Sequence, residues 1–149
     1  MPTDAPARAQ RVAEQAAQAL YSSDRASQAL GMRLTAVRPG WARVTMTVRA
    51  DMVNGHDTCH GGIVFSLADS AFAFACNTYN ERTVAAAAAI DFLAAARLGD
   101  ELTAEGAELW RTRRNGIYEI TVTNQRGERV ALFRGRSYRI EGPVMQLEE

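Results

Sequence analysis

Apolar residues in the first part of the chain lie at the spacing of a helix. Between about Ala5 and Tyr21 they recur every three to four residues with polar residues between them, which is the pattern of an amphipathic helix. A short second helix is expected after Ser23, and it should end at Gly31, because glycine favours helix ends. Together these elements predict an N-terminal helical segment over about residues 5–31.

The apolar period then changes to two, which is the period of a strand with one buried face. We expect a strand over Leu34–Arg38, a turn at Pro39-Gly40 and an antiparallel strand over "WARVTMTVR", residues 41–49. One side of this second strand takes the alternate apolar residues Ala42, Val44, Met46 and Val48.

A long apolar segment follows a polar loop at residues 50–60. Within "NGHDTCHGGIVFSLADSAFAFACN", residues 54–77, we predict a helix of about 17 residues, roughly 25 Å long. This helix is apolar around most of its circumference, so it must be enclosed by a sheet or by a partner chain. Its one charged residue is Asp69.

The C-terminal half supplies strands for such a sheet. "TVAAAAAIDFL", residues 83–93, is expected to be a strand although alanine favours helices. A strand over residues 101–113 should bulge at Gly106, so that Ala107 and Leu109 then face inward. Apolar and polar residues also alternate over residues 117–124 and 130–140, which predicts two more strands. A hairpin signal at Asn115-Gly116 precedes the first of them, and a turn signal at Arg126-Gly127 separates the two. The tail after Pro143 is expected to fray.

These elements predict one α+β domain over residues 1–149, with a core of about residues 33–141 in which about six antiparallel strands wrap one central helix. The 17 basic residues balance the 17 acidic ones, which gives no electrostatic reason to expect nucleic acid or an acidic membrane as a partner. The longest apolar run is shorter than a bilayer span. The start of the chain lacks a secretory signal, so we expect a cytoplasmic protein with free thiols at its two cysteines, Cys59 and Cys76.

Two features of the central segment indicate chemistry. A carboxylate on an enclosed helix, as at Asp69, is costly unless it is paired, and such burial is typical of a catalytic acid or base. The alternative is that Asp69 meets an arginine or a backbone amide and only stabilises the fold. The pair Gly61-Gly62 begins the helix, where free amides attract a carbonyl oxygen or an oxyanion, although a plain turn would use glycines equally well.

Two further clusters carry potential ligands. "HDTCH" contains four residues that can bind metals, His56, Asp57, Cys59 and His60, but no second His/Cys cluster completes a tetrahedral site. We therefore expect neither a metal centre nor a thiol nucleophile among them. Arginine matches phosphate oxygens, so a late cluster of arginines indicates either a phosphorylated ligand or charged strand edges. This cluster comprises Arg111, Arg113, Arg114, Arg134, Arg136 and Arg139.

Over about residues 40–140 the sequence resembles the PaaI group of hotdog-fold acyl-CoA thioesterases, which includes phenylacetic acid degradation thioesterases. The resemblance rests on "NGHDTCHGGIVFSLADSAFAFACN", "AIDFL" and "VALFRGRSYRI". It implies a hotdog fold and homodimers, usually paired into tetramers, with active sites shared between protomers. It also implies an acyl-CoA substrate, with a preference for small aryl-acetyl groups such as phenylacetyl or hydroxyphenylacetyl, and no cofactor.

The resemblance assigns roles residue by residue. Asp69 takes the position of the catalytic carboxylate, acting as general base or as nucleophile, and Gly61 that of the backbone donor to the thioester carbonyl. Asn54 and His60 take the flanking active-site positions. Where the family commonly continues with Arg-Pro after "IDFL", this chain has two alanines, so other arginines are candidates for CoA contacts. We therefore expect substrate binding at Gly62, Arg111, Arg113, Arg114 and Arg136.

Two other functions remain open from the sequence alone. A hotdog protein that binds acyl-CoA without hydrolysing it would not need Asp69, Asn54 or the glycine pair. A hotdog dehydratase or hydratase would use a histidine and a carboxylate together as acid and base.

Overall fold

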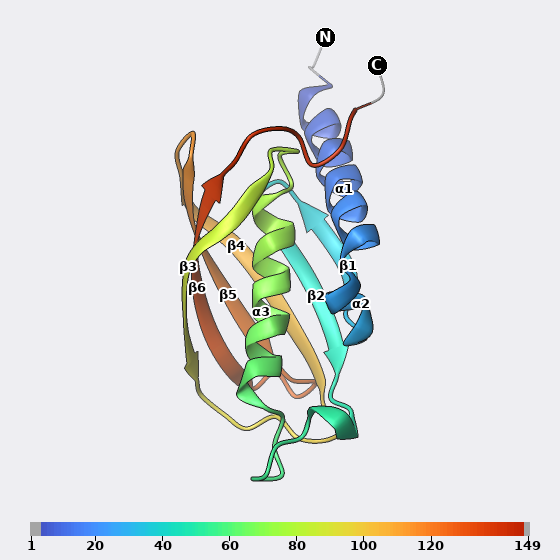
Figure 1. Cartoon of the computed structure of the whole chain (residues 1–149), viewed down its shortest axis with the longest axis vertical. Coiled ribbons are helices and arrows are strands. Elements are labelled where there is room, and N and C mark those ends of the chain that lie inside the picture. Colours follow the sequence, from blue (N-terminus) through green and yellow to red (C-terminus); the bar gives the residue numbers. More distant parts are fainter. Residues whose placement is uncertain (1–3, 148–149) are drawn as a thin grey trace.

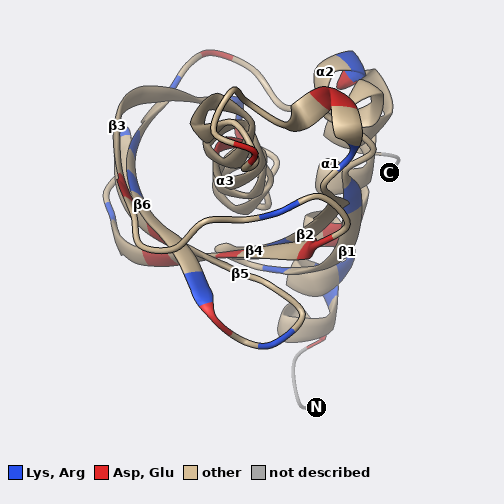
Figure 2. Ribbon diagram, turned by 90° about the horizontal axis from the view of Figure 1, so that it is seen from below, with Lys and Arg blue, Asp and Glu red and all other residues tan. Residues whose placement is uncertain are grey.

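The computed structural model describes residues 4–147 of the chain. Six antiparallel strands form one curved sheet, and helix α3 (Gly61–Cys76) lies in its concave face (Figures 1 and 2). Helices α1 (Ala5–Ser23) and α2 (Arg25–Ala29) lie beside α3 at the β1 edge of the sheet. This is the α+β architecture that the sequence predicts. None of the helices within residues 4–147 is long and apolar enough to cross a membrane.

The sheet has the strand order β1-β2-β4-β5-β6-β3. A single 3₁₀ turn, Ala50–Met52, follows β2 and leads into the loop before α3. The strands, all expected within a few residues of their observed bounds, are β1 (Arg33–Arg38), β2 (Trp41–Thr47), β3 (Thr83–Phe92), β4 (Glu101–Arg111), β5 (Asn115–Thr123) and β6 (Arg129–Arg139).

The core lies between α3 and the concave face of the sheet. The alternate residues of β2 are buried as predicted, and aromatic side chains of the sheet contact the helix. The Phe72 ring of α3 packs against Tyr118 of β5 and Phe133 of β6, with ring centroids 5.6 and 5.9 Å apart. Gly135 of β6 makes this contact possible, because a Cβ atom there would lie 2.8 Å from the Phe72 ring.

The predicted bulge at Gly106 is wrong in position. Gly106 stays in register opposite Ala42 and Ile120, and it is buried, while Ala107 and Leu109 are exposed. A Cβ atom at Gly106 would lie 3.0 Å from Ile120 and 3.4 Å from the carbonyl oxygen of Ala71. The glycine therefore allows α3 to approach the sheet, and the irregular register occurs later, between Glu108 and Trp110.

The predicted hairpin turn at Asn115-Gly116 is also misplaced. The turn occupies residues 112–114, and both residues of the pair already belong to β5. A Cβ atom at Gly116 would lie 2.8 Å from the Ser137 hydroxyl oxygen and from the Tyr118 ring. Gly116 is thus required by close packing across the sheet rather than by the turn.

Strand β3 confirms that tertiary pairing overrides the helix propensity of alanine. It pairs with β6 alone and forms an edge of the sheet. Residues 84–89 are exposed, and so are Phe92 and Leu93 just beyond the alanine run, with exposed fractions of 56% and 51%. The free edge of β3 leaves backbone groups unpaired on one side of the strand.

The tail after Pro143 does not fray as expected, at least as far as Met145. The side-chain amide nitrogen of Asn80 donates to the Met145 carbonyl, and the backbone amide of Met145 donates to the side-chain oxygen of Asn80, both at 3.0 Å. This reciprocal pair holds the tail across the end of α3 and places residues 143–144 next to the start of β3.

Candidate active site

Asp69 lies in the middle of α3 and lines a cavity of about 470 Å³. The cavity is bounded by α1, α3, the start of β3 and the tail. Apart from Asp69 and Arg82, its walls carry no charged side chain, and they are formed by Ala19, Leu20, Ser23, Phe72, Ala73, Asn77, Thr83, Val84, Ala85, Pro143 and Val144. A mostly uncharged cavity with one carboxylate in its wall is suited to hold a small acyl group beside a proton acceptor.

The Asp69 carboxylate is not used to stabilise the fold. Within residues 4–147 it accepts no hydrogen bond and pairs with no arginine, so the purely structural interpretation of this residue is not supported. Burial raises the pKa of Asp69 above the usual value for aspartate, and the negative charge of Asp24 raises it further. A half-buried carboxylate without partners, and with a raised pKa, is a stronger base than a solvated one.

The start of α3 presents one free backbone amide. His60 is the N-cap residue, and its Nδ1 atom accepts a hydrogen bond of 2.9 Å from the amide of Gly62. The amides of Ile63 and Val64 donate to the His60 carbonyl. In the part of the chain that the structure describes, the Gly61 amide has no acceptor. It is therefore the free amide at the positive end of the helix dipole.

Asn54 organises the loop before α3. Its side-chain oxygen accepts hydrogen bonds from the backbone amides of His56 and Thr58 and from the Thr58 hydroxyl, at 2.9 to 3.2 Å. The same loop contains Asp57 in the left-handed conformation, with φ of 65°. With its oxygen committed to the loop, Asn54 keeps its amide NH₂ group for other partners.

Asn54 and Gly61 line a second cavity, of about 340 Å³, which does not include Asp69. The two cavities lie at different levels of α3, because eight residues of helix separate Gly61 from Asp69, a rise of about 12 Å. Within one chain, the free amide and the carboxylate are too far apart to act on the same carbonyl group. The structure thus brings Asn54, His60 and Gly61 together but places Asp69 elsewhere.

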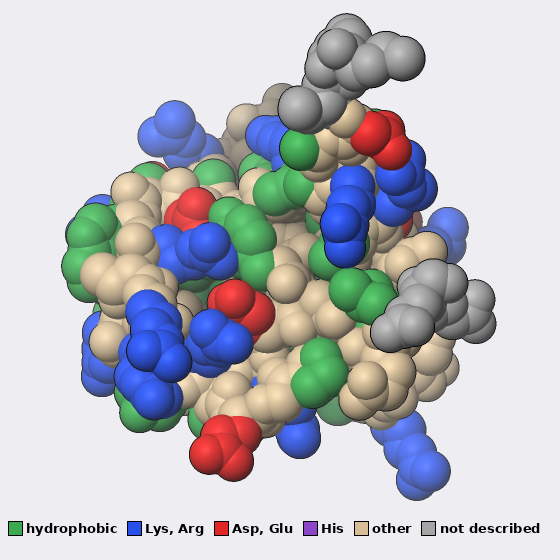
Figure 3. Space-filling model, turned by 90° about the horizontal axis from the view of Figure 1, so that it is seen from above, with side chains coloured by type: hydrophobic (Ala, Val, Ile, Leu, Met, Phe, Trp, Pro, Cys, Tyr) green, Lys and Arg blue, Asp and Glu red, His purple; other side chains and the backbone are tan. Residues whose placement is uncertain are grey.

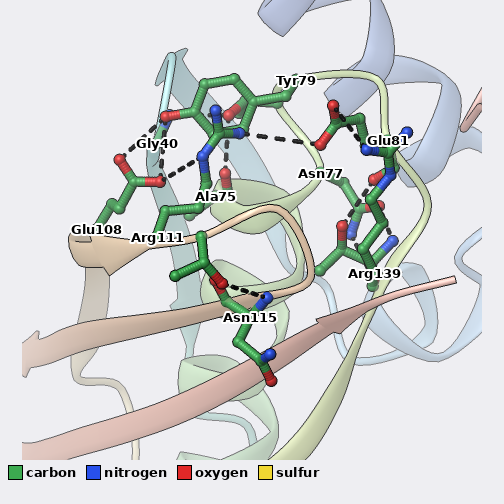
Figure 4. Close-up of polar contacts among 12 residues, drawn as sticks. Gly40, Ala75, Asn77, Tyr79, Glu81, Glu108, Arg111, Asn115 and Arg139 are labelled. Atoms are coloured by element: carbon green, nitrogen blue, oxygen red, sulfur yellow. Dashed lines mark hydrogen bonds and ion pairs between the residues drawn. The ribbon is translucent and has the colours of Figure 1, made fainter.

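Of the arginines expected to bind substrate, Arg111 is engaged in a network of side chains (Figure 4). Its guanidinium carbon lies 3.4 Å from the centre of the Tyr79 ring, and its Nε atom lies 3.5 Å from Glu108. Glu108 also accepts hydrogen bonds from the hydroxyls of Tyr79 and the buried Tyr118. This network ties the end of β4 to the segment after α3.

Arg113 and Arg114 lie in the β4–β5 turn and, with Arg139, line a cavity of about 260 Å³. Figure 3 shows arginine side chains gathered over this end of the molecule. Arg136 lies on β6, where it donates a hydrogen bond of 3.2 Å to the Asn115 side chain. Arg113 and Arg114 therefore remain available to an anionic ligand, whereas Arg111 and Arg136 already have partners.

Cys59 is buried, and burial raises the pKa of its thiol to about 11. A thiol with this pKa is protonated at neutral pH, which disfavours a nucleophilic role. Between residues 4 and 147 no three side chains of His, Cys, Asp or Glu are placed together as metal ligands.

Sequence reasoning missed two groups of residues near Asp69. Asp24 and Ser27 line a smaller cavity together with Asp69. The aspartate three residues before the serine could have indicated a helix cap in the sequence. Leu20 and Val144, which line the larger cavity, give no signal in the sequence, because the fold alone brings them to α3.

Comparison with known proteins identifies the family of the chain. Residues 56–131 match the family model of the thioesterase superfamily. The chain is 48% identical over 130 residues to acyl-coenzyme A thioesterase PaaI of Escherichia coli, covering 87% of this chain and 93% of that protein.

Solved structures give the same result. The E. coli PaaI protein from the phenylacetic acid degradation operon has a TM-score of 0.89 at 47% identity, over 90% of this chain and 97% of that one. A hypothetical thioesterase of Streptococcus pneumoniae, solved with coenzyme A, has a TM-score of 0.71 at 25% identity, over 73% and 85% of the two chains.

The fold and the family model together define a hotdog protein of the thioesterase class. More narrowly, the chain belongs to the thioesterase superfamily and to its PaaI group of thioester hydrolases.

Proposed function

We propose that this enzyme hydrolyses small acyl-CoA thioesters, aryl-acetyl thioesters such as phenylacetyl-CoA or hydroxyphenylacetyl-CoA above all, to the free acid and CoA. The observation that carries the proposal is that two groups needed for this reaction are both without partners within residues 4–147: the Gly61 amide and the Asp69 carboxylate. The similarity to the E. coli acyl-coenzyme A thioesterase supports the same reaction class.

In this mechanism the Gly61 amide donates a hydrogen bond to the thioester carbonyl oxygen and then to the oxyanion that forms from it. As general base, Asp69 would take a proton from a water molecule whose oxygen attacks the carbonyl carbon. As nucleophile, its own oxygen would attack, and water would then hydrolyse the mixed anhydride. Either route breaks the C–S bond and releases the CoA thiolate, which takes up a proton.

His60 and Asn54 support this chemistry in different ways. The Nδ1 atom of His60 accepts a hydrogen bond from the Gly62 amide, which helps to fix the first turn of α3 where the Gly61 amide lies. The NH₂ group of Asn54 would orient water or the carbonyl oxygen, a role supported by the cavity that Asn54 lines together with Gly61. Gly62 contributes by allowing substrate to pass close to the backbone.

For the CoA phosphates we propose Arg113 and Arg114 as the main contacts, since both are exposed and near Arg139. Arg111 and Arg136 can contribute only if substrate replaces their present partners. The Streptococcus pneumoniae structure with coenzyme A supports a CoA-binding role for this fold.

The active site is proposed to be complete only in a homodimer, with two dimers forming a tetramer. The exposed edge of β3 and the apolar residues Phe92 and Leu93 support pairing of two copies along this strand. A two-fold axis there would bring the Gly61 amide of one protomer to the Asp69 carboxylate of its partner, which accounts for their separation within one chain.

A CoA-release assay tests the proposed reaction. Purified protein is incubated with phenylacetyl, hydroxyphenylacetyl and straight-chain acyl-CoA thioesters, and the free thiol is measured with a chromogenic reagent. We expect turnover with the aryl-acetyl substrates to exceed turnover with the others. Tight acyl-CoA binding without thiol release would instead identify a binding protein, and water addition to an enoyl thioester would identify a hydratase.

The shared site has its own test. The Asn54→Ala and Asp69→Ala variants, each inactive alone, are unfolded together and refolded as random dimers, of which about half should be heterodimers. Each heterodimer has one intact site, so activity should return to roughly a quarter of the parental level. A mixture that assembles normally but stays inactive would place the whole site within one chain.

A further inference from the structure

Asp69 lines a second, smaller cavity in addition to the one described above. This cavity has a volume of about 220 Å³ and lies between α2 and α3. It is the more polar of the two near the carboxylate, because Ser66 and Ser70 of α3 and Asp24 and Ser27 of α2 contribute to its walls. Asp69 therefore stands between an apolar cavity and one that holds a second carboxylate.

Asp24 is held firmly at the edge of this smaller cavity. It is the N-cap residue of α2, and its Oδ1 atom accepts a hydrogen bond of 2.9 Å from the amide of Ser27. Its Oδ2 atom accepts the Ser27 hydroxyl at 2.5 Å. Ser27, which is only 2% exposed, lies 2.8 Å from the Ser70 hydroxyl.

The direction of these hydrogen bonds follows from counting protons. The Ser27 hydroxyl has one hydrogen, and Asp24 takes it, so the Ser70 hydroxyl must donate to Ser27. Two of these three bonds are accepted by Asp24, one at each carboxylate oxygen, and the third joins the two serines. Within residues 4–147 no arginine pairs with Asp24, so its negative charge is not neutralised by a counter-ion.

We propose that Asp24 is a positioning residue for thioester hydrolysis, whose fixed negative charge acts on the Asp69 carboxylate across the smaller cavity that both residues line. This inference rests on the proposed function. Asp24 touches no substrate and acts only through Asp69. Two negative charges across this small cavity repel each other, and protonation of Asp69 relieves the repulsion.

The other groups near Asp69 do not remove this effect. The residues that α1 contributes to the larger cavity are uncharged. The segment before β3 contributes Arg82, whose positive charge favours the ionised form of Asp69 and so opposes the effect of Asp24. On α3 itself the nearest titratable group is the thiol of Cys76, which is protonated at neutral pH because burial raises its pKa to about 12. Of the charged groups around both cavities, Asp24 is the one that raises the pKa of Asp69.

The alternative is that Asp24 does no more than cap α2. The Asp24→Asn variant separates the two roles, because asparagine caps a helix about as well as aspartate but carries no charge. Asp4→Asn is the matched control. Asp4 precedes the N-terminus of α1, whereas Asp24 follows its C-terminus, about 28 Å away along the helix axis. Asp4→Asn therefore removes one negative charge from a residue that lines neither cavity.

Two measurements decide between the roles. First, the titration of the Asp69 carboxyl is followed by carbon NMR, with its signal assigned by comparison with Asp69→Asn. Second, kcat/KM for phenylacetyl-CoA is measured against pH. In Asp24→Asn we expect the NMR midpoint and the acidic limb of kcat/KM to move to lower pH, while Asp4→Asn matches the parent. Plateau kcat should fall by less than about tenfold, since a weaker base transfers protons more slowly.

Salt provides a check that needs no variant. In the parent the Asp69 midpoint should fall as ionic strength rises, because salt screens the Asp24 charge, and this dependence should shrink in Asp24→Asn. An unchanged midpoint in Asp24→Asn, or a parental midpoint insensitive to salt, would refute the role of Asp24 while leaving the proposed function standing. A shifted midpoint in a protein that hydrolyses no thioester would refute the proposed function instead.

Discussion

Replacing Gly61 by proline removes a single hydrogen-bond donor with little other change. Gly61 is the first residue of α3, the position at which proline is best tolerated in a helix. The preceding residue, His60, has φ of −57° and ψ of 133°, which is the extended conformation that a following proline requires. Because the Gly61 amide donates no hydrogen bond to the described chain, its loss leaves no fold contact broken.

The size of the effect follows from the role of that amide. Loss of one oxyanion donor typically lowers kcat by about 10²–10³, or about 2.7–4 kcal/mol of transition-state stabilisation. The free energy of unfolding should change by less than about 1 kcal/mol, since proline restricts the unfolded chain. The added Cβ atom would lie 3.1 Å from the Phe92 ring, a contact that Gly61→Ala makes as well.

The assay is kcat for CoA release, measured beside the melting temperature of each variant. Gly61→Ala is the matched control, because it adds the same Cβ atom but keeps the amide hydrogen. We expect the alanine variant to remain within about tenfold of the parent and the proline variant to fall well below it. A proline variant that melts normally and hydrolyses as fast as the alanine variant would show that this amide does not bind the oxyanion.

Three further changes give contrasting results. Asp69→Asn should lower kcat for CoA release by a factor of about 10²–10⁴. It should be at least as stable as the parent at pH 7, as measured by thermal melts, because the raised pKa of Asp69 means that its ionised form destabilises the fold above that pKa. Cys59→Ser and treatment with a chelator should each leave turnover within a few-fold, and activity lost to a chelator but restored by zinc would revive the metal hypothesis. Gly135→Ala should lower the free energy of unfolding by about 1–3 kcal/mol, measured by denaturant titration, because its Cβ atom would overlap the Phe72 ring.

The sequence predicts the elements of this fold well where one periodicity dominates. The alternation in β2 and the apolar circumference of α3 led directly to a sheet around a central helix. Glycines misled the prediction where they serve tertiary packing. At Gly106 and Gly116 the reason for glycine is an atom from another element, which no local pattern reveals.

The residues of the candidate site also differ in whether the sequence could indicate them. Gly61 and Asp69 could be selected from the sequence because a free helix start and a lone carboxylate have local physical signatures. The walls of the larger cavity could not, since they come from four separate parts of the chain. Asp24 had a recognisable cap pattern, but only the packing of α2 against α3 places its charge near Asp69.

The alanine run of β3 also determines when this cavity can form during folding. Its local preference is helical, and its partner in the sheet is β6, the last strand within residues 4–147. On the ribosome, residues 83–92 are made well before residues 129–139, so β3 cannot pair with β6 until residues 129–139 have been made. The wall that β3 contributes beside Asp69, and the tail next to it, can therefore form only after β6 has been made.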